Sequence, residues 1–96
     1  MLINVPYKNG DVVSIKLSSG EEMVARLENE EDGKTIVSNP TMLVASEGGM
    51  GMAPFMFTVP MSSKFPLASS NIICIVKTDE DTAKTYAEQT SGIALA

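Results

Sequence analysis

Residues 13–27 read VSIKLSSGEEMVARL and carry the clearest structural signal in the chain. Apolar side chains recur at every second position from Val13 to Leu17 and again from Met23 to Leu27, as in strands with one buried face. Between these runs, residues 18–21 contain Gly20, which is free to adopt the positive φ that tight turns require. We therefore expect two antiparallel strands that form a hairpin.

A second turn and a third strand follow this hairpin. Residues 30–33 read EEDG, and an Asp-Gly pair favours the tight turn of a β-hairpin. Residues 34–37 and 42–44 are again rich in apolar side chains and predict the third strand. Pro40 has no backbone N–H, so it should bend this strand or leave part of its edge unpaired.

Residues 46–63 have a different composition. Residues 47–52 read EGGMGM, which predicts a flexible loop. Apolar side chains then alternate from Phe55 to Met61 and predict a fourth strand, which Pro54 and Pro60 would confine to an edge or a strongly bent position. Two interpretations of the methionine-rich loop stay open. It is a mobile connector, or it lines a pore or grips a partner, because methionine adapts to irregular surfaces.

A last strand is predicted at residues 72–76, which read IICIV. Both faces of this strand are apolar and rich in β-branched residues, so we expect both faces to be covered and the Cys74 thiol to be buried. A chain of 96 residues offers little material for this cover. A neighbouring subunit would supply it.

A short helix is predicted after the last strand, over residues 78–90. Thr78 is the expected N-cap, and the acidic residues 79–81 place negative charge on the first turn, where the helix dipole favours it. The apolar face is small and centres on Tyr86, so the helix should dock weakly and stay outside the core. Gly92 should end the helix, and residues 93–96 would trail or dock on a partner.

Composition bounds the possible functions. The length of 96 residues fits a single domain over residues 1–96, and 12 acidic against 7 basic residues exclude a generic basic-patch nucleic-acid binder. The chain has no histidine and one cysteine, which excludes Ser-His and Cys-His catalysis, zinc-imidazole sites and an internal disulfide. We expect a non-catalytic, cytoplasmic protein without a cofactor, a metal or a membrane span.

Residues 13–27 resemble the first half of the Sm1 motif of Sm-like proteins, with Ala25 in place of the family's strand glycine. Residues 67–75 are similar to the Sm2 motif, in which a short polar loop precedes the last apolar strand. The resemblance covers residues 12–76 and is closest to the small Sm-like proteins that marine cyanophages encode. If the chain comes from a phage, the cytoplasm is that of the infected host cell.

The resemblance implies a mainly β fold, a strongly bent five-stranded antiparallel barrel over about residues 11–77 with a short C-terminal helix. It also implies a homo-oligomeric ring of about five to seven subunits, in which the last two strands pair with adjacent subunits. The residues expected at this subunit interface are Phe57, Val59, Ile72, Ile73, Cys74, Ile75 and Val76.

The resemblance also implies single-stranded RNA as a partner of the ring. Glu31, Lys34 and Thr35 stand at the family's Asp, Met and Asn positions, and Ala68 and Ser69 stand at its Arg-Gly pair. The candidate RNA-binding residues are Lys34, Thr35, Ser69, Ser70 and Asn71. The alternative is a ring-shaped scaffold that binds protein partners and no nucleic acid.

Overall fold

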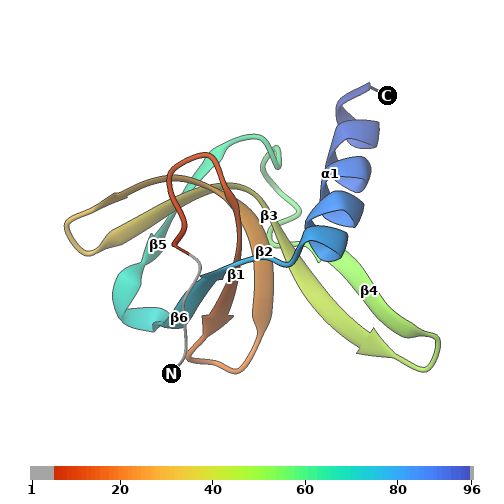
Figure 1. Ribbon diagram of the computed structural model, residues 1–96, viewed down its shortest axis with the longest axis horizontal. Helices are drawn as coiled ribbons and strands as arrows, with labels where there is room; N and C mark the ends of the chain where they lie inside the picture. Colours follow the sequence, from red (N-terminus) through yellow and green to blue (C-terminus); the bar gives the residue numbers. More distant parts are fainter. Residues whose placement is uncertain (1–5, 96) are drawn as a thin grey trace.

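The computed structural model describes residues 6–95 and the side chains of residues 6–90. Its elements, in chain order, are β1 (Val12–Leu17), β2 (Glu22–Glu31), β3 (Lys34–Ser46), β4 (Gly49–Pro54), β5 (Lys64–Ala68), the 3₁₀ turn η1 (Ser69–Asn71), β6 (Ile72–Lys77) and α1 (Glu80–Leu95). The strands curve around one core, and α1 stands beside them (Figure 1). The expectation of a mainly β fold with a C-terminal helix is therefore confirmed.

The strands form one antiparallel sheet of six strands in the order β4-β3-β2-β1-β6, with β5 paired to β3. Residues 34–38 of β3 pair with β5, and residues 41–46 pair with β4. The prediction of five strands was thus wrong. The sheet has a sixth strand because β4 and β5 are two separate strands, which pair with the same edge of β3 and are joined by an irregular segment.

Both predicted hairpin turns are confirmed. The β1–β2 pairing closes at Lys16 opposite Glu22, and the β2–β3 pairing closes at Glu31 opposite Lys34. Gly20 has φ +102° in the first turn and Gly33 has φ +70° in the second. These values explain why each turn carries a glycine at that position.

The predicted bend in the third strand lies at Asn39 and Pro40. Asn39 has φ +50°, a left-handed conformation that asparagine tolerates better than most residues. The β2 ladder shifts register here, and the partner of β3 on its other edge changes from β5 to β4. Beyond the bend, β3 and β4 form a hairpin that projects from the rest of the sheet (Figure 1).

The expected loop and fourth strand of the middle region were placed wrongly. Gly49–Pro54 is a strand, whereas residues 55–63 form bends and turns. The backbone of β4 pairs with residues 41–46 of β3, and this ladder needs no large side chains. Residues 55–63 form isolated backbone hydrogen bonds instead. The Ser63 N–H donates to the nearby Pro60 carbonyl at 3.0 Å, and the Met61 carbonyl accepts the N–H of Asn39 in β3 at 2.7 Å.

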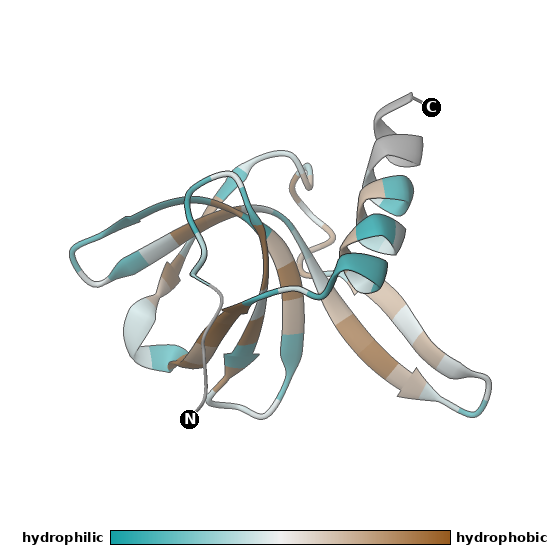
Figure 2. Ribbon diagram, in the orientation of Figure 1, coloured by the Kyte–Doolittle hydropathy of each residue, from teal (hydrophilic) through white to brown (hydrophobic). Residues whose placement is uncertain are grey.

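The core lies on the inner face of the curved sheet. Its fully or nearly fully buried side chains are Val13, Ile15, Met23, Ala25, Leu27, Val37 and Phe65. Figure 2 shows the corresponding apolar bands on the strands and the hydrophilic surface of α1. Phe55 packs edge-to-face on Phe65 with ring centroids 6.0 Å apart, so the irregular segment starts against the core.

The start and end of the helix differ from expectation. Asp79 is the N-cap: its Oδ2 accepts the Thr82 N–H at 2.9 Å. Thr78 is buried instead, and its hydroxyl bonds the Ser14 hydroxyl at 2.8 Å, because its backbone still belongs to the end of the β1–β6 ladder. The helix runs through Gly92 to Leu95, since a helical glycine costs only about 1 kcal/mol. The side chains of residues 93–96, expected to trail or dock, lie outside the described residues.

The helix is anchored more firmly than its small apolar face suggested. Tyr86 is 1% exposed, and its hydroxyl donates to the Asn39 carbonyl at 2.8 Å. One buried side chain therefore fixes α1 on the bend of β3. No helix in the described part of the chain is long and apolar enough to cross a lipid bilayer.

Candidate functional site

The β2–β3 turn lies against η1, which brings three of the candidate RNA-binding residues together. Lys34 pairs in register with Ala68, next to Ser69. The Ser69 N–H donates to the Gly33 carbonyl at 3.0 Å, and the hydroxyls of Thr35 and Ser69 lie 3.0 Å apart. Two segments about 35 residues apart in the chain thus form one surface.

The candidate residues differ in accessibility. Thr35 is 2% exposed, so it positions Ser69 and does not itself face solvent. Lys34, Ser69 and Ser70 are exposed and available to a ligand. Asn71 is exposed too, but it lies toward the β1–β2 turn, where its carbonyl accepts the Ser18 N–H at 2.8 Å.

Four of residues 28–32 are acidic and precede Lys34 in the chain, and two of them contact other side chains. Glu28 accepts the Ser38 hydroxyl at 2.6 Å and lies 3.9 Å from the Lys64 ammonium. Glu30 accepts the Tyr7 hydroxyl at 3.2 Å; burial, followed by the charge of Glu30, raises the pKa of Tyr7. Among the side chains that the structure describes, no three histidine, cysteine or acidic residues are grouped to hold a metal ion.

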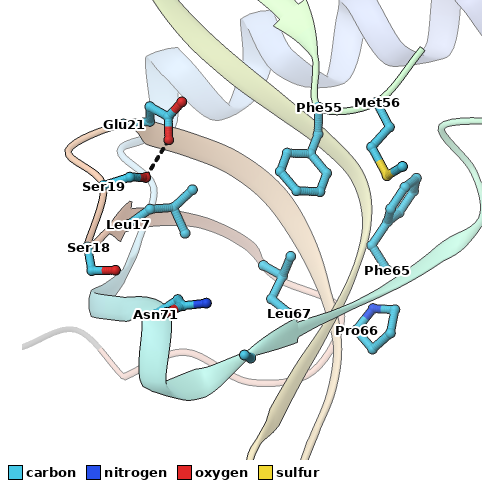
Figure 3. Close-up of a pocket in the computed structure, with 11 residues that line it drawn as sticks. Leu17, Ser18, Ser19, Glu21, Phe55, Met56, Phe65, Pro66, Leu67 and Asn71 are labelled. Atoms are coloured by element: carbon cyan, nitrogen blue, oxygen red, sulfur yellow. Dashed lines mark hydrogen bonds between the residues drawn. The ribbon is translucent and has the colours of Figure 1, made fainter. Parts of the chain in front are cut away.

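A cavity of about 570 Å³ opens between β5 and the β1–β2 turn. Leu17, Phe55 and Leu67 form its apolar wall, while Ser18, Glu21 and Asn71 are at its polar rim (Figure 3). The Ser19 hydroxyl donates to the Glu21 carboxylate and holds this rim. Because β5 and β6 are joined through η1 without pairing with each other, the cavity lies where the sheet stays open.

Three side chains of β6 are exposed in the single chain although their residues are apolar or a cysteine. Ile73 is 64% exposed and Val76 is 50% exposed. Cys74 is exposed as well, so the expectation of a buried thiol was wrong for the isolated subunit. Ile72 and Ile75 pack on the core, and the register of β6 with β1 shifts between them. Among the described strands, β6 pairs only with β1, so its other edge is unpaired.

Phe57 and Val59 are the other two residues expected at a subunit interface. Phe57 is 83% exposed and Val59 is 39% exposed, both in the irregular segment between β4 and β5. They are therefore accessible but do not belong to a strand.

Sequence reasoning missed two smaller cavities between α1 and the β3–β4 hairpin, of about 140 and about 330 Å³. The alternation of glycine and methionine at residues 49–52 could have indicated the strand β4 that lines them, because period two is typical of a strand, but not the cavities themselves. No protein-family model and no curated protein matches this chain.

Proposed function

We propose that this chain is a non-catalytic Sm-like protein that assembles into a ring and binds single-stranded RNA. One observation supports the ring most strongly: the sheet is left open between β5 and β6. In the described residues, β6 pairs only with β1, and β5 pairs only with β3. Unpaired edges of this kind are normally covered, and pairing β6 of one subunit with β5 of the next would cover both.

Exposed apolar side chains stand on β6 and in the segment that leads to β5. Ile73 and Val76 stand on β6, and Phe57 and Val59 precede β5. Fully burying side chains of this size contributes about 1.5–3 kcal/mol each, which would compensate the limited core of a short chain. A contact between two different surfaces closes into a ring when its rotation permits. The resemblance to Sm-like proteins implies about five to seven subunits.

The proposed RNA contacts are Lys34, Ser69, Ser70 and Asn71, with Thr35 as a positioning residue. Lys34 supplies a cation for a phosphate, and the hydroxyls and amide supply hydrogen bonds to bases or sugars. Each such site is weak alone, because Glu31 lies opposite Lys34 in the hairpin. Repetition around a ring raises the effective affinity, since one strand contacts several subunits.

The alternative function is a homo-oligomeric ring scaffold that binds protein partners and no nucleic acid. The net charge of -5 favours it, because a negative surface repels RNA phosphates. Both functions share the ring, so the assembly and the RNA contact need separate tests. Neither function requires a cofactor.

The interface is tested by sedimentation velocity with two matched variants. Ile73→Asp places a charge on the proposed interface, and Val44→Asp makes the same change on the projecting hairpin, where Val44 is 47% exposed. We expect Ile73→Asp to reduce the oligomer to smaller species, while Val44→Asp sediments like the parent chain. Equal sedimentation of all three proteins as oligomers would place the interface elsewhere.

RNA binding is tested by fluorescence anisotropy with labelled oligouridine. Affinity should fall steeply between about 50 and about 200 mM salt, as expected for phosphate contacts. Lys34→Gln should weaken binding, whereas Lys16→Gln removes the same charge from β1 and should change it little. Equal losses in both variants, or no binding by an assembled ring, would refute the RNA site and favour the scaffold.

A further inference from the structure

One face of the β3–β4 hairpin is lined by apolar side chains and turned toward α1. Leu43 lies opposite Met52 and Ala45 opposite Met50 in the β3–β4 register. Alternate residues of paired strands share a face, so these four side chains lie together. Leu43, Met50 and Met52 line the cavity of about 330 Å³, together with Asp81, Thr82 and Thr85 of α1.

The second cavity continues the first along the helix. The cavity of about 140 Å³ shares Met52 with its neighbour and adds Met61, with Tyr86, Gln89 and Thr90 on the helix side. The residues of α1 that line the two cavities are three or four positions apart, so they form one stripe along one side of the helix. We name the combined feature the methionine groove: its apolar wall is Leu43, Met50, Met52 and Met61, and its polar wall is the stripe of α1 from Asp81 to Thr90.

The groove has the dimensions of an extended peptide. Nine residue steps along a helix at 1.5 Å each give a length of about 14 Å, which is the span of about four extended residues. The apolar wall offers adaptable methionine side chains, and Met50 is 66% exposed. Figure 1 shows α1 and the β3–β4 hairpin projecting from the sheet in different directions.

The negative charge of the chain is concentrated on the two elements that form the groove. Residues 39–61 and 79–90 carry five acidic side chains and one basic side chain, Lys84. The rest of the chain carries seven acidic and six basic side chains. Asp81 lies on the groove wall itself. Glu80 is exposed on α1, Asp79 is exposed just before the helix, and Glu47 is exposed in the turn between β3 and β4.

We propose that the methionine groove binds a short, extended, basic segment of a partner protein, with apolar side chains alternating with lysine or arginine. The apolar side chains would contact the methionine wall, and the cations would face the acidic wall. This charge disfavours nucleic acid as the occupant. The β2–β3 turn, with the candidate RNA contacts, lies at the opposite end of the molecule (Figure 1), so both ligands could be bound at once.

The test measures fluorescence anisotropy of labelled hexapeptides with blocked ends. The probe is an alternating Leu-Lys peptide, and the controls are alternating Ser-Lys and alternating Leu-Glu peptides. We expect the Leu-Lys peptide to bind and both controls to bind at least tenfold more weakly, since the proposal requires apolar and cationic groups together. If the Ser-Lys peptide binds as tightly, the interaction is unspecific charge attraction and the proposal is wrong.

Protein variants locate the bound peptide. Met50→Ser should lower the affinity for the Leu-Lys peptide roughly fivefold, because apolar contact is lost. Asp81→Asn should lower the same affinity roughly threefold at low salt, because a charge interaction is lost. The matched controls are Val44→Ser, on the opposite face of the hairpin, and Glu88→Gln, which removes an equal charge from a part of α1 that lines neither cavity. Both controls should change binding by less than twofold. Equal losses in test and control variants would overturn the proposal.

Two further outcomes would assign the groove to another occupant. If Met50→Ser lowers the mass of the oligomer, a second copy of the chain occupies the groove and the proposal is wrong. If oligouridine displaces the Leu-Lys peptide, the groove belongs to a nucleic-acid site, and the proposal is equally wrong. Because the ring and the RNA contact have their own variants, Ile73→Asp and Lys34→Gln, their failure is distinguishable from failure here.

Discussion

Tyr86→Phe tests whether one buried hydroxyl fixes the helix on the bend of β3. Tyr86 is 1% exposed, and its hydroxyl lies 2.8 Å from the Asn39 carbonyl that it donates to. The substitution keeps the aromatic ring of the side chain and removes only its hydroxyl group. A lost hydrogen bond to a buried carbonyl costs about 1 kcal/mol, so the variant should melt roughly 4–8 °C below the parent at neutral pH.

The same variant should change how stability depends on pH. Burial raises the pKa of Tyr86 from 10.0 to about 12. The folded state therefore holds the phenolic proton more tightly than the unfolded state does, and the stabilisation is complete below pH 10 and lost as the pH rises toward 12. The full loss is about 2–3 kcal/mol, and about half of it is reached at pH 11. Tyr86→Phe has no such proton, so the parent and the variant should be about equally stable near pH 11.

Urea unfolding followed by far-ultraviolet circular dichroism measures both effects, because the chain has no tryptophan and tyrosine fluorescence changes as the phenol ionises. The control is Tyr7→Phe, which removes an exposed hydrogen bond to Glu30 and should cost less at neutral pH. A difference between parent and Tyr86→Phe that stays constant from pH 7 to pH 11 would refute the assignment of the buried phenol.

Three further predictions concern the cap, the candidate site and the thiol. Asp79→Ala should lower the melting temperature at neutral pH, because it removes the N-cap of α1. The Thr82 N–H holds the pKa of Asp79 below 3.8, so the difference in melting temperature between parent and variant should shrink as the pH falls below that value. A difference that is unchanged at pH 2 would contradict the role of the Asp79 carboxylate as N-cap. Thr35→Val should lower the free energy of unfolding in urea by about 1 kcal/mol, because it breaks the hydrogen bond to Ser69. It should also weaken any RNA binding. An unchanged free energy of unfolding would show that this hydrogen bond contributes nothing to stability. Cys74 should react with Ellman's reagent slowly in the assembled ring and quickly in the Ile73→Asp variant; equal rates would mean that β6 is not at the interface.

The hairpins were predictable from sequence because local signals agreed there. Alternation, the glycine positions and the Asp-Gly turn all indicate the same strands, and residues 12–37 follow them. The strand Gly49–Pro54 was missed because glycine has a low strand propensity, and its partner edge on β3 exists only after the bend at Asn39 has formed. Tertiary pairing outweighed local propensity at that point.

The candidate site was predictable only in part. The neighbourhood of Lys34, Thr35 and Ser69 was expected from the family resemblance, whereas composition and periodicity gave no indication of it. The methionine groove was not predictable, since it depends on where a single tyrosine docks a terminal helix. The exposed Cys74 shows the same limit: an apolar run indicates that a strand will be covered, but not whether its own chain covers it.

The ring is the central claim, and absolute mass by light scattering tests it most directly. The unmodified chain should be measured over a wide dilution series, because a stable ring keeps its mass while a weak association does not. We expect a constant mass of about five to seven times the 10.2 kDa of one chain. A concentration-independent mass of 10.2 kDa would contradict it and leave β6 as an uncovered edge of a monomer.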